Sequence, residues 1–154
     1  MSISKLCIRN VAMVSKDTSI IEAARLMRER HVGDVIAVEH KGRSPVPIGI
    51  LTDRDIVTAI IAKDVDIHKL IVRDVMTYQL VTCHENESIS KTIELMKING
   101  VRRLPVVNDE GILVGIISSD DLLYMLSVEL GGIGKISDRQ FEKEKITRPT
   151  TIPA

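Results

Sequence analysis

The chain has 154 residues, of which 44% are hydrophobic and 27% charged, a composition typical of a folded globular protein and not of a disordered one. Its 21 basic and 21 acidic residues cancel, so no global charge attracts it to nucleic acid or to an anionic membrane. It has neither a signal-peptide pattern nor an uncharged apolar run of about 18 residues, so we expect a cytoplasmic protein without a membrane segment.

The first predicted elements form one structural unit. A short apolar strand over Val11–Val14 leads into a helix that begins near Ser19, where Ser19 and Glu22 have the spacing of a capping box. Two strand-forming runs follow, Val35–Val38 and Ile48–Leu51, joined by a turn-rich loop. A second helix is expected after the sequence GILTDRD.

A second unit with the same order of elements follows a charged, partly helical connector at 64–75. Its strand Leu80–Cys83 leads into a helix that begins near Ser88. The next two strands, Leu104–Val107 and Leu113–Ile117, flank the hairpin turn NDEG. The last helix is expected after the sequence GIISSDD.

The two units are copies of one sequence. VAMVSKDTSI (11–20) aligns with LVTCHENESI (80–89), and GILTDRD (49–55) aligns with GIISSDD (115–121). The first copy is longer only in the turn-rich loop, where insertions cost little. A unit of about 60 residues is marginally stable alone, so we expect the two copies to share a core. The segment 131–154 shows little periodicity, and we expect a polar tail that is either mobile or docks a partner.

The repeated phrase places a hydroxyl and a carboxylate at the start of each second helix. Thr52 and Ser118 suit the N-cap position, and Asp55 and Asp121 then fall three residues later, where a carboxylate favours the helix dipole. Capping alone would account for one copy of the phrase.

The same geometry also suits a ligand. Backbone N–H groups at a helix start attract phosphate, and a spare carboxylate there can accept hydrogen bonds from the vicinal hydroxyls of a ribose. The glycine of each phrase, Gly49 or Gly115, would allow a ligand to approach the backbone closely. Two copies of the phrase, taken together with the family resemblance described below, favour nucleoside binding over capping alone.

These motifs resemble those of the tandem cystathionine-β-synthase (CBS) domain family, whose paired form is called a Bateman module. The resemblance covers roughly residues 5–130 and includes HVGDVIAV, GVRRLPVV and DVMTYQLVT. It implies an α/β (α+β) fold of two β-α-β-β-α repeats packed about a pseudo-twofold axis. Repeat 1 would span 5–63, the linker 64–75, repeat 2 76–130 and the tail 131–154. The first copy departs by having Cys7 where the second has Met76, and by lacking a proline opposite Pro105.

The resemblance further implies an adenosine-type ligand, with AMP, ADP or ATP favoured, bound between the motif of one repeat and strands of the other. One cleft would use Gly49, Thr52, Arg54, Asp55, Thr77, Val81, Val101, Arg102 and Arg103. The other would use Gly115, Ser118, Asp121, Ala12, Val32, Gly33 and Asp34. Arg102 and Arg103 could neutralise phosphates, with help from Arg54. Because Asp34 occupies the position equivalent to Arg103, the Asp55 cleft is expected to bind nucleotide more tightly.

No constellation typical of an enzyme or a metal site is expected. Asp53 and Asp55 lie at a helix start, where neighbouring side chains point apart, and the histidines lack metal-ligand spacing. Cys83 and His84 are adjacent on a strand and should face opposite ways, so we predict a buried thiol and not an activated one. We therefore expect no catalytic residue, no metal and no cofactor.

The sequence thus predicts a regulatory, energy-sensing module that changes conformation when an adenosine nucleotide binds and is read by an unidentified protein target. The apolar run Leu122–Leu130 suggests a homodimer. Two alternatives stay open. The chain could be a structural or DNA-associated interaction module, or it could bind S-adenosylmethionine or NADH.

Overall fold

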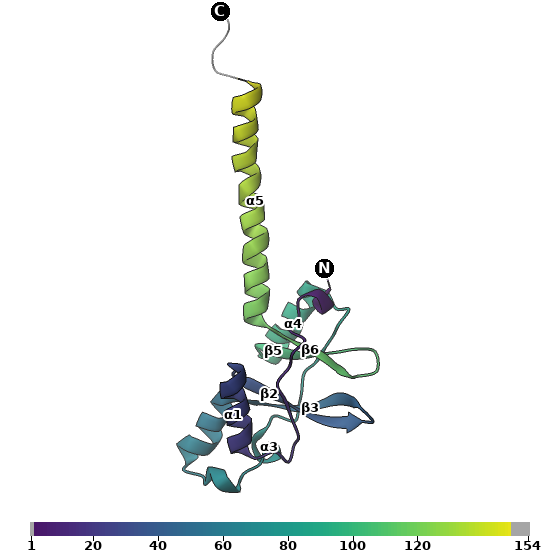
Figure 1. The fold of residues 1–154 in the computed structure, drawn as a ribbon, viewed down its shortest axis with the longest axis vertical. Coiled ribbons are helices and arrows are strands. Elements are labelled where there is room, and N and C mark those ends of the chain that lie inside the picture. Colours follow the sequence, from purple (N-terminus) through teal and green to yellow (C-terminus); the bar gives the residue numbers. More distant parts are fainter. Residues whose placement is uncertain (1, 149–154) are drawn as a thin grey trace, which may run out of the picture. The chain divides into compact units, whose positions relative to one another are not determined.

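The computed structural model describes residues 2–148 and contains two three-stranded sheets (Figure 1). In the first sheet β1 (Met13–Val14) pairs in parallel with β2 (Asp34–Lys41), which pairs antiparallel with β3 (Ser44–Thr52). Helix α1 (Ile20–Arg30) connects β1 to β2. The second helix of this repeat begins as α2 (Asp53–Asp55) immediately after β3.

The second sheet repeats this topology with the same register. Strand β4 (Cys83–His84) pairs in parallel with β5 (Arg103–Val107), and β5 pairs antiparallel with β6 (Leu113–Ser118). Helix α4 (Ile89–Asn99) connects β4 to β5, and α5 (Ser119–Thr147) follows β6. The predicted α/β fold of two β-α-β-β-α repeats is therefore confirmed.

Local sequence signals produce the helix ends and turns that were predicted. The hydroxyl of Ser19 accepts from the backbone N–H of Glu22, and that of Ser88 accepts from Lys91, each at 3.2 Å. In the NDEG turn, the side chain of Asn108 accepts from two backbone N–H groups, and Gly111 has a φ of +75°, which favours glycine. The turn residues thereby fix the register of β5 and β6.

Several elements differ from the sequence-based expectation, among them the turn-rich loop, most of which extends β2 and β3. Strands β1 and β4 are only two residues long. Before them, the backbone N–H groups of Val11 and Leu80 donate to Arg9 and Tyr78 of their own segments and not to a neighbouring strand. After α2 the chain continues as a π-helical turn, Ile56–Ile60, and a 3₁₀ turn, Ile61–Lys63, instead of a regular α-helix. The connector is partly helical, as expected, with α3 at Val72–Val75.

Helix α5 replaces most of the expected irregular tail. The chain divides into two compact units, one ending at Ser119 and the other starting at Asp120, and α5 forms the described part of the second unit. The helix continues through the glycines at 131, 132 and 134 to Thr147, so the segment 131–147 is helical; residues 149–154 lie outside the described part. Neither α5 nor any other helix in residues 2–148 has the length and apolar character that crossing a membrane requires.

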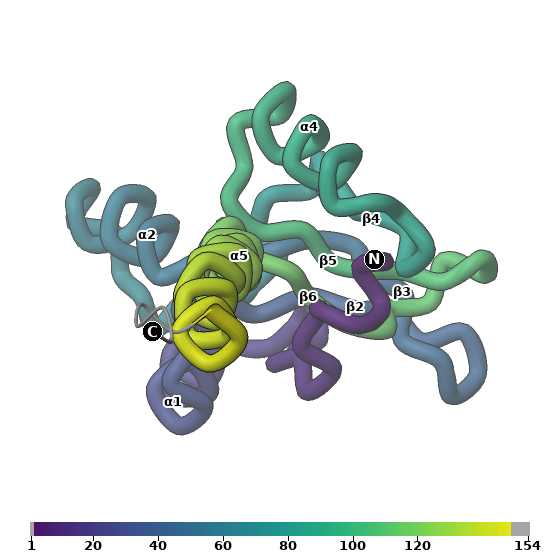
Figure 2. Tube along the Cα trace, turned by 90° about the horizontal axis from the view of Figure 1, so that it is seen from above, coloured from purple at the N-terminus to yellow at the C-terminus, as the bar shows by residue number. Residues whose placement is uncertain are grey.

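The first unit contains apolar clusters that pack on both sheets. Figure 2 shows the sheets lying between α1 and α4. Side chains from α1, β2 and the segment after α2 form the core of repeat 1, including Ile20, Val35 and Ile60. A second cluster joins the repeats, since Val11, Ile36 and Val38 of repeat 1 pack with Leu113 of repeat 2. The two repeats therefore share apolar packing, as their small size predicted.

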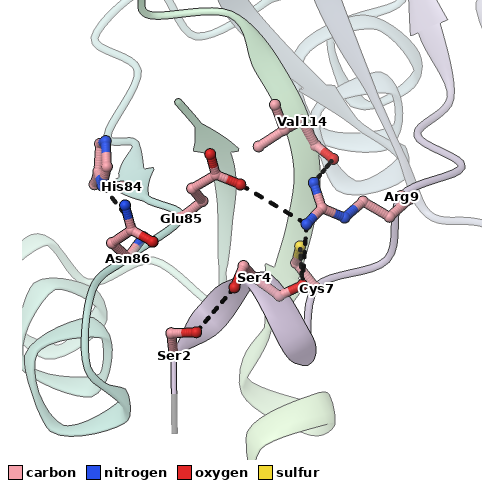
Figure 3. A network of polar contacts seen from close by, with 8 residues as sticks. All are labelled: Ser2, Ser4, Cys7, Arg9, His84, Glu85, Asn86 and Val114. Carbon is pink, nitrogen blue, oxygen red and sulfur yellow. Dashed lines mark hydrogen bonds and ion pairs between the residues drawn. The ribbon is translucent and has the colours of Figure 1, made fainter. Parts of the chain in front are cut away.

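The lead-in segment of each repeat crosses to the other repeat. The backbone of Ile8 pairs with Ile116 of β6, and the Arg9 guanidinium donates to the carbonyl of Val114 at 3.3 Å and to that of Ser4 at 3.1 Å (Figure 3). The same guanidinium lies 3.8 Å from the Glu85 carboxylate. The residues before β1 are thus anchored on repeat 2.

The connector makes the reciprocal crossing onto repeat 1. The backbone N–H of Val72 donates to the carbonyl of Thr18, and that of Arg73 donates to Lys16. The Arg73 side chain also pairs with Asp17 at 3.1 Å. Thr77, which follows the connector, pairs with Ile50 of β3. Each repeat therefore begins on its neighbour's sheet, an arrangement that periodicity within one repeat could not predict.

Candidate functional site

The GILTDRD phrase ends β3 and begins α2 with a complete capping box. The Thr52 hydroxyl accepts from the backbone N–H of Asp55 at 3.1 Å. In return, Asp55 Oδ2 accepts from the backbone N–H of Thr52 at 2.9 Å and from its hydroxyl at 2.8 Å. The sequence suggested that Asp55 is a spare acceptor, but the capping box uses one of its two oxygens. Its Oδ1 accepts no hydrogen bond from residues 2–148, which leaves one oxygen for a ligand.

The glycines of both phrases make room for protein side chains. A Cβ on Gly49 would lie 2.6 Å from Met76 Sδ, and a Cβ on Gly115 would lie 2.6 Å from Cys7 Sγ. Met76 and Cys7 occupy equivalent positions in the two lead-in segments that cross between the repeats. The Cβ side of each glycine is therefore occupied by a side chain, and a role of Gly49 or Gly115 in ligand binding stays a prediction. The alignment of Cys7 with Met76 was the only sequence signal for this role.

Thr77 of repeat 2 lies beside the motif strand of repeat 1. Its backbone N–H donates to the carbonyl of Ile50 at 2.9 Å, and its carbonyl accepts from Ile50 at 3.2 Å. The exposed Thr77 side chain therefore stands next to β3, two residues before Thr52. Val81, further along the same segment, is half-buried.

Arg103 extends from β5 to the start of β2. Its Nε donates to Asp34 Oδ1 at 2.9 Å, and the carboxylate is almost fully buried whereas the guanidinium is about two-fifths exposed, with side-chain values of 10% and 39%. The sequence placed these residues in separate clefts, with Arg103 available for a phosphate. The structure brings them together as an ion pair between the repeats, so a phosphate contact of Arg103 stays a prediction.

Asp53 and Gly33 complete this charged cluster. The backbone N–H of Asp53 donates to the carbonyl of Gly33 at 2.9 Å. A Cβ on Gly33 would lie 3.0 Å from Asp53 Oδ2 and 3.6 Å from an Arg103 terminal nitrogen, so both side chains approach this glycine. Burial raises the pKa of Asp34, Arg103 opposes that effect, and the Asp53 carboxylate adds to it. Sequence reasoning missed the contribution of Asp53 beside Arg103.

The other predicted residues of the Asp55 cleft are Arg102, Val101 and Arg54. Arg102 Nε donates to the Ser119 hydroxyl at 3.5 Å, and the Arg102 carbonyl accepts from the Ser119 N–H at 2.8 Å. Val101 is half-buried after α4, and the Arg54 side chain is exposed in α2. Arg54 and Arg102 thus follow β3 and precede β5, at the same ends of these strands as Thr52 and Arg103.

The residues predicted for the second cleft lie at positions of the repeat equivalent to those of the Asp55 cleft. Ala12 is buried and its carbonyl accepts from Ile36 at 2.9 Å, whereas Val32 is exposed. Ser118 pairs with Arg103 in the β5–β6 ladder. Asp121 belongs to the first turn of α5, in the second unit, so its participation in this cleft stays a prediction.

A separate cavity of about 480 Å³ opens at the opposite ends of β1 and β2. Its walls are Met13, Val14, Ser15, Lys16, Val38, Glu39 and His40, and none of the predicted site residues belongs to it. Lys16 and Glu39 form an ion pair across this surface at 2.6 Å. The hydrogen bond from the Lys16 ammonium to Glu39 raises the pKa of Lys16.

Cys83 and His84 do not form an activated nucleophile. Cys83 is 2% exposed, and burial raises the pKa of its thiol to about 12, so it stays protonated near neutral pH. The adjacent His84 turns the other way, with Nε2 at 2.9 Å from Asp109 Oδ1. Within residues 2–148 no three His, Cys, Asp or Glu side chains converge as metal ligands would.

Comparison with known proteins identifies the repeat. The family model described as the CBS domain matches twice, at residues 3–62 and 72–128. The chain belongs to the CBS-domain family. The two matches coincide with the two β-α-β-β-α repeats, so this CBS pair is assembled with the reciprocal crossing of lead-in segments seen in the structure.

Individual relatives cover most of the pair. An uncharacterized protein of Methanopyrus kandleri is 34% identical over 80% of this chain, which spans 62% of that relative's length. A CBS domain-containing protein of Bacillus subtilis is 40% identical over 73% of this chain and 76% of its own. A CBS domain pair solved with 5′-methylthioadenosine and S-adenosyl-L-methionine is 25% identical, has a TM-score of 0.72, and covers 82% of this chain and 99% of its own.

Proposed function

We propose that this CBS pair is a regulatory module that binds an adenosine ligand in a cleft around Asp55. The observation that carries the proposal is the meeting of two repeats at one helix start. Thr52 and Asp55 come from repeat 1, whereas Thr77 and Arg103 come from repeat 2. A ligand in contact with all four would bridge the repeats, and its binding would favour one arrangement of them over another.

The chemistry of the residues suits a nucleoside. Asp55 Oδ1 would accept a hydrogen bond from a ribose hydroxyl, while Oδ2 stays in the capping box. The side chains of Arg54, Arg102 and Arg103 would face the phosphates of AMP, ADP or ATP, which are the ligands we favour. S-adenosylmethionine is the principal alternative, because a CBS pair of 25% identity was solved with it and with 5′-methylthioadenosine. We place the module in the cytoplasm, where it would act on a separate protein target by binding and not by catalysis.

Thermal unfolding of the intact chain with separate candidate ligands tests the proposal. A ligand at about 100 times its Kd stabilises a folded protein by about 2.7 kcal/mol. For a chain of this size, we expect Tm to rise by several degrees with AMP, ADP, ATP, S-adenosylmethionine or 5′-methylthioadenosine. NADH is included as a bulkier adenosine ligand. Absence of any Tm shift with every compound would overturn adenosine binding.

Calorimetric titration of Asp55→Asn locates the site. Loss of a charged hydrogen-bond acceptor should weaken binding of the active ligand about tenfold or more. Asp109→Asn is the matched control, because it removes the same charge from the exposed NDEG turn and should leave the Kd within about twofold. Equal effects of the two substitutions would exclude the Asp55 cleft as the site.

We also infer that α5 pairs with α5 of a second copy. The helix is about 43 Å long at 1.5 Å per residue and carries an exposed apolar stripe, namely Leu123, Leu126, Leu130 and Ile133. Its three glycines disfavour a solitary helix by about 1 kcal/mol each, so a packed partner is needed for stability. Residues 119–134 hold three acidic and no basic residues, whereas 135–148 hold five basic and three acidic residues. In an antiparallel pair, the acidic half of one helix would lie beside the more basic half of the other.

The mass of the protein in solution tests this pairing. Leu130→Glu introduces a charge into the stripe and should convert a dimer into a monomer in light scattering after size exclusion. Val128→Glu is the matched control, since Val128 is also exposed but faces away from the stripe, 160° around the helix from Leu130. A wild-type monomer, or the same dimer in both variants, would refute pairing through this stripe.

A further inference from the structure

An ion pair in the first unit joins the two CBS repeats. Asp34 is the first residue of β2 and Arg103 is the first residue of β5, and their side chains meet at 2.9 Å. Because the Asp34 side chain is only 10% exposed, its carboxylate depends on this guanidinium for compensation. The pair therefore links the central strands of the two repeats directly.

The surroundings of this pair are unfavourable to an added anion. Asp53 lies beside Gly33 and adds a second carboxylate to the cluster, so Asp34, Asp53 and Arg103 together carry one net negative charge. Arg103 has Nε engaged by Asp34, so a phosphate could not also use this edge of the guanidinium in a bidentate contact. A phosphate that binds Arg103 by this edge has to replace the Asp34 carboxylate.

We propose that the Asp34–Arg103 pair is a latch between the repeats, which a phosphorylated adenosine ligand opens and an unphosphorylated one leaves closed. The inference rests on the proposed adenosine site and specifies how that site would signal. AMP would draw Arg103 toward its phosphate and thereby break the contact between β2 and β5. Adenosine or 5′-methylthioadenosine would make the ribose contact with Asp55 without this exchange of partners.

This exchange predicts that Asp34 sets the ligand preference. In the wild-type protein, AMP binding includes the cost of separating a buried carboxylate from its cation, whereas adenosine binding does not. Removing the charge of Asp34 releases Arg103 and also removes a repulsion toward phosphate. The effect is therefore specific to ligands that carry a phosphate.

Calorimetric titration of AMP and adenosine into the full chain tests the latch. Asp34→Asn should tighten AMP binding by tenfold or more and change adenosine binding by less than threefold. Asp17→Asn is the matched control, because it removes one carboxylate from another ion pair, with Arg73, outside the cleft. This control should change neither Kd by more than threefold. Unchanged AMP binding in Asp34→Asn, or an equal gain for adenosine, would overturn the latch.

A measurement on the wild-type protein covers the case in which Asp34→Asn does not fold. The ¹⁵N–¹H signal of Arg103 Nε, assigned by its loss in Arg103→Lys, should move on addition of AMP and stay in place with adenosine. If both ligands bind and the Arg103 signal moves equally with both, or moves with neither, the latch is overturned while adenosine binding stands. If neither AMP, adenosine nor 5′-methylthioadenosine binds, the proposed site itself fails and the latch with it.

Discussion

Substitution of Gly49 by alanine probes the crossing of the lead-in segments. The new Cβ would lie 2.6 Å from Met76 Sδ and 3.1 Å from both Met76 Cγ and Cε. Ordinary contact between heavy atoms is roughly 3.5–4.0 Å, so the sulfur would have to move by about 1 Å. Met76 is only 5% exposed and packs in the core of repeat 1, which restricts that movement.

The expected loss follows from two opposing terms. Overpacking of a core costs about 1–3 kcal/mol. Replacing glycine by alanine within a strand otherwise gains about 0.5–1 kcal/mol. We therefore expect Gly49→Ala to lower the free energy of unfolding by about 1 kcal/mol, the difference between the middle values of these two ranges.

A double-mutant cycle assigns the loss to Met76. Met76→Ala alone should cost about 2–5 kcal/mol, but it removes the three atoms that lie nearest to the new Cβ. Gly49→Ala should then be neutral or stabilising in that background, which gives a coupling of about 1–3 kcal/mol. Urea unfolding followed by circular dichroism measures all four proteins. Gly131→Ala is the control, because a Cβ there meets no atom within 4 Å, and helix content should rise.

Two results would refute the reasoning about Gly49. One is a Gly49→Ala protein at least as stable as the wild type, which would mean that Met76 relaxes at no cost. The other is additivity of the two substitutions within about 0.5 kcal/mol, which would mean that the contact with Met76 is not the cause.

Further predictions concern the helix cap and the buried thiol. Thr52→Val removes the hydroxyl of the capping box while keeping its shape, and should lower the free energy of unfolding by about 1 kcal/mol in urea titration; unchanged stability would contradict the cap. Cys83 should resist a thiol reagent at pH 8 in the native protein and react on unfolding, because burial raises its pKa to about 12. Peptide mass measures the modification, and rapid reaction of the native protein would contradict burial of the thiol. Above about pH 9 the unfolded thiol releases a proton that the folded thiol retains, so stability should fall as pH rises; this fall should be smaller in Cys83→Ala.

The sequence by itself determined the repeated secondary structure. Ser19 and Ser88 begin helices because each places a hydroxyl where the backbone N–H three residues later needs an acceptor. The NDEG turn sets a hairpin because Asn108 and Gly111 suit its backbone. These effects are local, and equal spacing in the two copies therefore predicted two equal units.

Helix α5 shows where local reasoning was insufficient. The glycines near 131 and the weak periodicity beyond them indicated a polar tail, but the structure has helix to Thr147. Glycine lowers helix propensity by only about 1 kcal/mol per residue, which packing of an apolar stripe can outweigh. The stripe was visible in part, as Leu122–Leu130, but its continuation was not.

The capped start of α2 was predicted from sequence, but the charged partners that meet between the repeats were not. The phrase at Thr52–Asp55 indicated a capped helix start with a carboxylate beside it, because both depend on a spacing of three residues. The partners of Gly49, Asp34 and Arg103 lie on the other repeat, so no spacing within a repeat specifies them. Only the tertiary structure placed Met76 against Gly49 and Arg103 against Asp34, since the crossing of lead-in segments and the meeting of β2 with β5 decide which distant side chains share a buried space.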